Sequence, residues 1–273
     1  MKLFFSWNLV LALICFYDQS QAQEIKRAIS LSPAITELVF ALKLQSKLVG
    51  VSEYSDFPKE ALKITSVGPY NKPSFEKIIF LKSDLVLIPQ EGPQENQLKL
   101  DQLKIGYAVV PMKSISEIGS AARQIAKLLG NEKVGVDFEK KWLASVNASY
   151  PKKGRIKKKI KTFMEIQSDP LIVAGGETFL NEAMENCGFE NIFGLEKGYP
   201  MVSLEHALTE KPDIIFITDG YDSAHDEAEI EKRWHQYPSL SKTNIIFLNS
   251  KAATRPGPRF IETIKKICAA ALL

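Results

Sequence analysis

The sequence predicts an α/β protein with two Rossmann-like lobes, each built on a mostly parallel central sheet, with a helical connector between them. Three observations predict this fold class: strand-like runs alternate with helical patterns in both halves, a helical stretch separates the halves, and one short segment occurs twice. Hydrophobic residues make up 45% of the 273 residues, so the chain can bury a sizeable core. The formal net charge of +3 is too small to indicate nucleic acid as a partner.

The N-terminus has the order basic, apolar, polar that is typical of a secretory signal peptide. Ser20 and Ala22 supply small residues before a cleavage site, so we expect residues 1–22 to be removed on export. The apolar run is shorter than the about 20 residues that a membrane span needs. Cys15 leaves lipid attachment as an alternative, although the two residues before it are bulkier than those that normally precede a lipidated cysteine.

The N-terminal lobe is predicted over residues 23–113. Short runs rich in Val, Ile and Leu alternate there with runs of helical periodicity, which indicates βαβ units. We expect strands at 27–32, 47–52, 84–89 and 107–112, and helices at 33–44, 75–82 and 97–106.

The connector is predicted over residues 114–150, with a helical pattern that is interrupted near Gly130-Asn131. The C-terminal lobe follows over residues 151–273. Its basic stretch at 152–161 has no interleaved aromatic residues, which favours a solvated linker over a nucleic-acid patch. We expect C-terminal strands at 160–166, 213–218 and 244–249 and a helix at 178–188.

The repeated segment is SFEKIIFLKSDLVLI at Ser74–Ile88 and SLEHALTEKPDIIFI at Ser203–Ile217. In each copy, a serine caps a helix, a glutamate follows in the first turn, and an aspartate precedes a buried strand. Glu76 and Glu205 are favourable near the helix dipole by about 0.3–1 kcal/mol. This local effect explains why glutamate is tolerated there, but not why both lobes present the same acidic turn.

Two cysteines, Cys187 and Cys268, remain after removal of residues 1–22. An even number in an exported protein suits an oxidising compartment. The residues alone leave two alternatives, a pair of buried thiols or one disulfide that closes a loop of about 80 residues.

The three histidines give no sign of catalysis. His206, His225 and His235 have no recognised catalytic spacing, and the chain has no nucleophile elbow and no phosphate-binding glycine pattern. So few histidines also disfavour capture of zinc or manganese. We therefore predict no enzyme, no catalytic residue, no metal site and no cofactor.

Five motifs carry a resemblance to a known family: AISLSPAITEL, VGVSEYSDFP, the paired Ser-x-Glu segments, NCGFENIF and RPGPR. With them, essentially the whole mature chain resembles the class III periplasmic binding proteins of ABC importers, and most closely the cobalamin-binding members. The resemblance implies two lobes joined by one long helix, a periplasmic monomer, small closure movements, and delivery of a transported ligand to a membrane permease.

The resemblance also implies roles for particular residues. It implies a disulfide between Cys187 and Cys268, and docking of Glu76 and Glu205 onto arginines of the permease. The ligand-binding residues that it implies are Ser32, Pro33, Tyr54 and Tyr70 on the N-terminal lobe, and Gln167, Tyr199 and Arg255 on the C-terminal lobe.

Departures from the cobalamin-binding pattern bear on the ligand. Tyr70 and Tyr199 stand where cobalamin binders have tryptophan, and Lys251 and Ala252 stand where they have an acidic residue and a tryptophan. The expected pocket is therefore less aromatic and more basic. A corrinoid, cobalamin or an analogue, is the first expectation, and haem or a ferric siderophore is the alternative.

Overall fold

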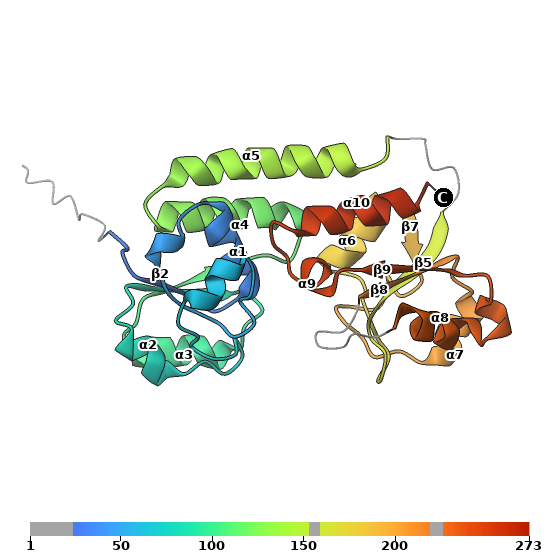
Figure 1. Cartoon of the computed structure of the whole chain (residues 1–273), viewed down its shortest axis with the longest axis horizontal. Helices are drawn as coiled ribbons and strands as arrows, with labels where there is room; N and C mark the ends of the chain where they lie inside the picture. The colour runs from blue at the N-terminus through green and yellow to red at the C-terminus, as the bar shows by residue number, and fades with distance from the viewer. Residues whose placement is uncertain (1–23, 153–158, 219–225, 273) are drawn as a thin grey trace, which may run out of the picture.

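The computed structural model describes residues 24–152, 159–218 and 226–272. It has two α/β lobes side by side, with helix α5 (Glu132–Ser149) lying along one edge of the molecule and reaching over both lobes (Figure 1). The fold class predicted from the sequence is confirmed. The expected signal peptide with Cys15, and His225, lie outside the described residues. None of the helices in the described ranges is long and apolar enough to cross a membrane.

The sheet of the N-terminal lobe (N-lobe) is fully parallel, in the order β2-β1-β3-β4. Alternate residues of β3 face opposite sides: Leu85 and Leu87 join the core under α1 and α4, whereas Val86 and Ile88 join the core under α2 and α3. The strands are β1 (Ala28–Ser30), β2 (Leu48–Val51), β3 (Leu85–Pro89) and β4 (Tyr107–Val110). The helices are α1 (Pro33–Ala41), η1 (Gln45–Lys47), η2 (Lys59–Lys63), α2 (Phe75–Phe80) and α3 (Gln94–Gln102).

The sheet of the C-terminal lobe (C-lobe) has the order β6-β5-β8-β9, and β7 also pairs with β5. Its pairs are parallel except β5 with β6. Figure 1 shows α6 and α10 on the side of α5, and α7 and α8 on the opposite side. The strands are β5 (Ile160–Gln167), β6 (Ile172–Val173), β7 (Phe189–Asn191), β8 (Ile214–Thr218) and β9 (Asn244–Leu248). The helices are α6 (Phe179–Asn186), α7 (Leu204–Glu210), α8 (Glu227–His235), η3 (Pro238–Leu240), α9 (Ser250–Ala253) and α10 (Phe260–Ala270).

The predicted connector forms two helices, α4 (Ile115–Leu128) and α5, which turn back on each other at Gly130 (φ 81°). They pack closely because Gly135 has no side chain: a Cβ there would lie 2.6 Å from the Cβ of Ala126. Helix α4 packs on α1 in the N-lobe, and α5 reaches α10 in the C-lobe. The interlobe helix is therefore α5 alone, while the exact lobe boundaries stay a prediction.

Two further contacts hold the C-lobe elements in place. The predicted disulfide is confirmed: Cys187, at the end of α6, is bonded to Cys268 in α10, 81 residues later. Closing a loop of this length is worth about 4.5 kcal/mol in the chain-entropy model. Glu182 in α6 accepts a hydrogen bond from the backbone N–H of Ile115 (2.8 Å), which fixes the start of α4 to the C-lobe. Burial raises the pKa of Glu182, and the Ile115 N–H offsets only part of this effect.

Candidate functional site

Three of the predicted ligand-binding residues lie at the carboxyl ends of strands. Ser32 and Pro33 follow β1 directly and open α1, and Gln167 is the last residue of β5. In open α/β sheets, ligands bind outside the carboxyl ends of the strands. The topology thus places candidates from both lobes at the edge where a ligand is expected.

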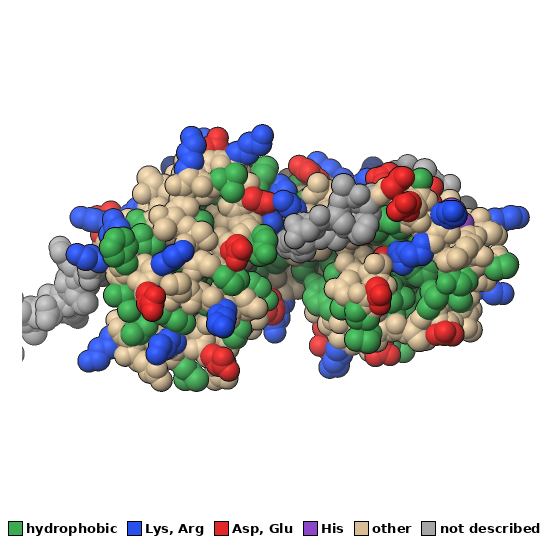
Figure 2. Space-filling model, turned by 60° about the horizontal axis from the view of Figure 1, so that its bottom comes forward, with side chains coloured by type: hydrophobic (Ala, Val, Ile, Leu, Met, Phe, Trp, Pro, Cys, Tyr) green, Lys and Arg blue, Asp and Glu red, His purple; other side chains and the backbone are tan. Residues whose placement is uncertain are grey.

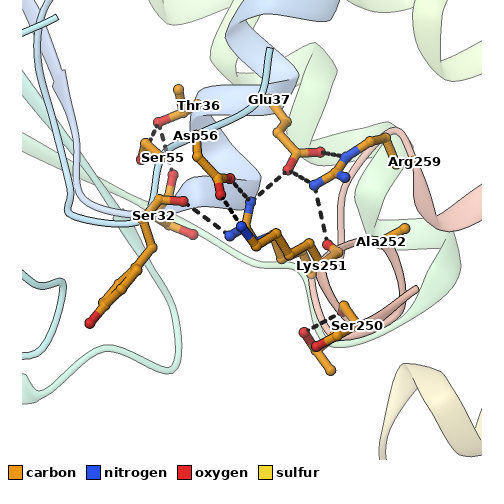
Figure 3. Close-up of polar contacts among 12 residues, drawn as sticks. Ser32, Thr36, Glu37, Ser55, Asp56, Ser250, Lys251, Ala252 and Arg259 are labelled. Atoms are coloured by element: carbon orange, nitrogen blue, oxygen red, sulfur yellow. Dashed lines mark hydrogen bonds and ion pairs between the residues drawn. The ribbon is translucent and has the colours of Figure 1, made fainter. Parts of the chain in front are cut away.

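A buried group of hydroxyls fixes the loop after β2 against the start of α1. The Thr36 hydroxyl donates to Ser30 Oγ (2.9 Å) and lies 3.2 Å from Ser55 Oγ, which in turn lies 3.1 Å from Ser52 Oγ. Figure 3 shows Thr36 and Ser55 beside Ser32 in this corner. These bonds give the 52–55 loop a defined position, and Tyr54 is part of that loop.

Tyr54 is held in an unusual backbone conformation that presents its ring to solvent. Its φ is 64°, in the left-handed region, where a bulky residue costs of the order of 1–3 kcal/mol. The residue is 55% exposed, so burial of its ring in the core does not offset the free-energy cost of the left-handed backbone. Its carbonyl accepts hydrogen bonds from the Asp56 N–H (2.9 Å) and from Arg255 Nη2 (3.0 Å). The surrounding structure therefore imposes the conformation of Tyr54.

Five charged side chains form an interlobe ion cluster: Glu37 and Asp56 from the N-lobe, and Lys251, Arg255 and Arg259 from the segment after β9. Arg259 donates to both carboxylate oxygens of Glu37, from Nε (2.9 Å) and Nη2 (2.5 Å). Arg255 Nη1 donates to Asp56 (2.7 Å) and lies 3.3 Å from Glu37. Lys251 Nζ donates to the other oxygen of Asp56 (2.5 Å). Figure 3 labels four of the five, Glu37, Asp56, Lys251 and Arg259, which meet between α1 and the α9 segment.

The side chains of the interlobe ion cluster differ in their exposure to solvent. The side chains of Glu37 and Arg255 are only 2% and 3% exposed, whereas that of Lys251 is 46% exposed. Burial alone would raise the pKa of Asp56, but the hydrogen bonds and charges of Lys251 and Arg255 together hold it below its usual value. The buried part ties the lobes together, and Lys251 forms the part that solvent reaches.

Arg255 was predicted from its motif as a ligand contact, and the structure adds a role that the sequence did not predict. Its guanidinium bonds Glu37, Asp56 and the Tyr54 carbonyl, so it positions a ligand candidate and joins the two lobes. Sequence reasoning also missed Glu37 and Arg259. Glu37 is the one charged residue in the apolar run PAITELVFA, and that placement was the available signal for a buried ion pair.

The C-lobe candidates lie on segments whose position depends on two glycines. Gly175 N–H donates to the Gly198 carbonyl (2.8 Å), next to Tyr199, which is about half exposed. A Cβ at Gly175 or Gly176 would lie 2.3 Å from a backbone oxygen of the segment that leads to Tyr199. The absence of a side chain at these two glycines therefore allows the two backbone segments to lie close together. Gln167 is exposed at the end of β5, where its Nε2 donates to the Asp169 carbonyl (2.9 Å).

Tyr70 lines a shallow surface hollow in the N-lobe. Asn96 Nδ2 donates to the Tyr70 carbonyl (2.9 Å), so α3 holds this residue at the hollow. The hollow is too shallow to enclose a ligand by itself. Its other lining residues are Leu31, Ile88, Pro89, Gly92, Pro93, Asn96 and Gln97.

The repeated Ser-x-Glu turns form as predicted. The Lys77 N–H donates to Ser74 Oγ (3.3 Å) at the start of α2, and the His206 N–H donates to Ser203 Oγ (3.2 Å) at the start of α7. Glu76 and Glu205 are both exposed. Helices α2 and α7 lie at the edge of their lobes opposite α5 (Figure 1). Figure 2 turns that edge forward and shows an indentation between the lobes, with charged and apolar side chains interspersed on both.

The described histidines have structural partners. His206 packs edge-on against Phe193, with ring centroids 5.0 Å apart, and His235 Nε2 lies 2.9 Å from the Thr243 carbonyl oxygen. Across the described ranges, no three His, Cys, Asp or Glu residues are grouped so as to hold a metal ion.

Two α/β lobes with a polar contact zone between them define a bilobal binding protein. A family model described as a periplasmic binding protein matches residues 29–252, and the chain belongs to this family. Membership places the protein in the periplasm and assigns it a binding role, in agreement with the prediction that it is no enzyme.

Relatives of the chain match it over nearly their whole length. The vitamin B12-binding protein of Vibrio vulnificus (strain YJ016) is 31% identical over 259 residues, which are 94% of this chain and 93% of that protein. The vitamin B12-binding protein of Salmonella typhimurium (strain LT2) is 34% identical over 247 residues, with coverage of 89% and 88%.

Solved structures agree with the fold. The periplasmic vitamin B12 binding protein BtuF of Vibrio cholerae superposes with a TM-score of 0.80 at 28% identity, over 91% of this chain and 97% of that one. The periplasmic heme-binding protein RhuT from Roseiflexus sp. RS-1 also has a TM-score of 0.80, over 90% and 98%, but at 22% identity it shows the fold alone.

Proposed function

We propose that this protein captures a corrinoid, cobalamin or an analogue, between its lobes and delivers it to the membrane permease of an ABC importer. The observation that carries the proposal is the match of vitamin B12-binding relatives over nearly the whole chain, at 31% and 34% identity. The corrinoid is cargo in this proposal, and no cofactor takes part.

The proposed ligand contacts come from both lobes. Exposed tyrosine rings suit a large flat macrocycle, because they offer apolar faces while their hydroxyls stay hydrated. Tyr54, Tyr70 and Tyr199 are all about half exposed, which supports this role. The complete proposed set is Ser32, Pro33, Tyr54, Tyr70, Gln167, Tyr199 and Arg255.

A titration of the mature protein tests the ligand. Purified residues 23–273 are titrated with cyanocobalamin, dicyanocobinamide, haemin and a ferric siderophore, by calorimetry and visible spectroscopy. We expect saturable one-to-one binding of a corrinoid. The second candidate, haem or a ferric siderophore, is favoured by tyrosines at 70 and 199 and by Lys251. Saturable binding of haemin alone would reject the corrinoid.

Glu76 and Glu205 are the proposed docking residues. Their positions in matching first turns, one on each lobe, suit two basic sites on a permease, where such charges set orientation and encounter rate. Reversal of both charges to lysine is expected to abolish uptake in cells while the ligand affinity stays within twofold of the wild type. Glu132 opens α5 on the opposite edge, and E132K serves as the matched control that leaves uptake unchanged. Loss of ligand affinity in the double variant would reject the docking role.

Export and oligomeric state complete the proposal. Cleavage after Ala22 should yield a periplasmic protein that starts at Gln23, and intact-mass spectrometry measures this directly. A mass gain on Cys15 would instead indicate lipidation. We expect a monomer in light scattering.

A further inference from the structure

Lys251 is the exposed member of the interlobe ion cluster, and its surroundings differ from those of an ordinary surface lysine. It lies in α9, and its side chain extends across to Asp56 on the other lobe (Figure 3). Asp56 is two residues after Tyr54, which is one of the proposed ligand contacts. The ammonium group therefore stands where the two lobes meet, close to the proposed binding edge.

The carboxylate that Lys251 contacts is shared. Asp56 Oδ2 accepts from Lys251 and Asp56 Oδ1 accepts from Arg255, so one negative charge serves two cations. An ammonium group has three N–H donors, and Asp56 takes one of them through the bond that the structure shows. With 46% of its side chain exposed, Lys251 can donate to a further acceptor without leaving Asp56.

We propose that Lys251 is a specificity residue that donates to an anionic substituent, a carboxylate or a phosphate ester, at the edge of the bound ligand. The inference rests on the proposed function and deepens it by naming the charge of the ligand. A compact ammonium between two lobes, partly screened from water, favours an anion over a neutral group of similar shape. Both ligand classes under consideration carry such groups: the nucleotide loop of cobalamin contains a phosphodiester, and haem has two propionates.

The test compares ligands that differ in the anion. Cyanocobalamin is paired with dicyanocobinamide, which lacks the phosphodiester, and haemin is paired with its dimethyl ester, which lacks the free carboxylates. Dissociation constants are measured for the wild type, K251Q and K251R. We expect K251Q to bind the anionic member of the pair about 5–20-fold more weakly and the neutral member within twofold, while K251R stays close to the wild type.

Lys161 provides a matched control. It is 44% exposed and pairs with Glu210 at 2.9 Å, but it lies at the start of β5, at the end of the strand opposite to Gln167. K161Q should leave both affinities unchanged. Circular dichroism and the unfolding midpoint show whether each variant is folded, which we expect because both lysines are exposed.

The outcomes separate the two proposals. Equal weakening of both members by K251Q, no weakening of either, or an equal effect of K161Q overturns the role of Lys251. Binding of haemin but no corrinoid contradicts the proposed function. In that case the effect of K251Q on haemin and on its dimethyl ester still tests whether Lys251 recognises an anion. If the protein binds neither corrinoids nor haemin, the same comparison is made with a ferric siderophore that carries a carboxylate and one that is neutral. K251Q must then weaken binding of the carboxylate siderophore alone.

Discussion

The buried part of the interlobe ion cluster yields the sharpest prediction about stability. Glu37 is 2% exposed and accepts two hydrogen bonds from Arg259 and a longer one from Arg255. E37Q has nearly the same volume, so it creates no cavity. It removes the charge, however, and turns one oxygen acceptor into an N–H donor that faces the arginine donors.

The expected loss follows from this geometry. Removing one partner of a buried ion pair typically costs about 3–5 kcal/mol, because the remaining charge stays buried without compensation. Arg255 keeps Asp56 as a partner and Arg259 is 17% exposed, so we expect the lower half of that range, about 3 kcal/mol. Urea unfolding of the oxidised protein at pH 7, followed by tryptophan fluorescence and circular dichroism, measures the loss.

Two further variants test the reasoning behind this number. Replacing both partners in E37M/R259M should cost clearly less than the sum of the single substitutions, because no charge is then left unpaired. The Glu177–Lys197 pair has a similar distance of 2.8 Å but is mostly exposed, so E177Q should leave the unfolding midpoint unchanged. A loss below 1 kcal/mol in E37Q would refute the claim that the cluster holds the lobes together.

Three other predictions concern single contacts. Reducing the bond between Cys187 and Cys268, or replacing both by alanine, should lower the free energy of unfolding by about 2–5 kcal/mol in urea titrations. E182Q should stabilise the protein at pH 7, because the raised pKa makes the ionised carboxylate unfavourable in the folded state. Unfolding titrations at several pH values should show this gain fading as pH falls from the raised folded-state pKa toward the unfolded value of 4.5, and vanishing at lower pH, where Glu182 is protonated in both states. Y54G should raise the thermal midpoint slightly and weaken ligand binding about tenfold or more, since it relieves the left-handed backbone but removes the exposed ring; a lower midpoint with unchanged affinity would contradict both parts.

The secondary structure could be predicted from the sequence because its signals are local. The continuous apolar run of Leu85, Val86, Leu87 and Ile88 indicates a strand buried on both faces, and both faces of β3 are indeed buried. The break at Gly130 was also visible, since glycine readily adopts the positive φ found there. What the pattern did not indicate is that the chain turns back at this break, so that α4 packs against α5 and also against α1 of the N-lobe. That outcome depends on the close contact at Gly135, a packing effect between helices.

The site was harder to predict because its contacts join distant parts of the chain. Arg259 and Glu37 are 222 positions apart, and Lys251 and Asp56 are 195 apart. No local periodicity links such pairs, so only a resemblance could suggest that they meet. The resemblance identified Arg255 through its RPGPR motif but implied a ligand contact, and the buried bonds of its guanidinium emerge only from the fold.

The interlobe ion cluster also bears on how the proposed capture proceeds. Opening the lobes wide enough to separate Glu37 from Arg259 would leave both charges without their partner, at a cost of about 3–5 kcal/mol. Asp56 and Lys251 lie at the exposed end, where water can solvate both charges and separation costs far less. We therefore expect the buried contact to persist during ligand entry, while any opening is confined to the exposed end of the cluster, so that the lobes move only slightly. Spin labels on α3 and α8 would then report nearly equal distances with and without ligand, and a change above about 5 Å would show that the buried contact opens as well.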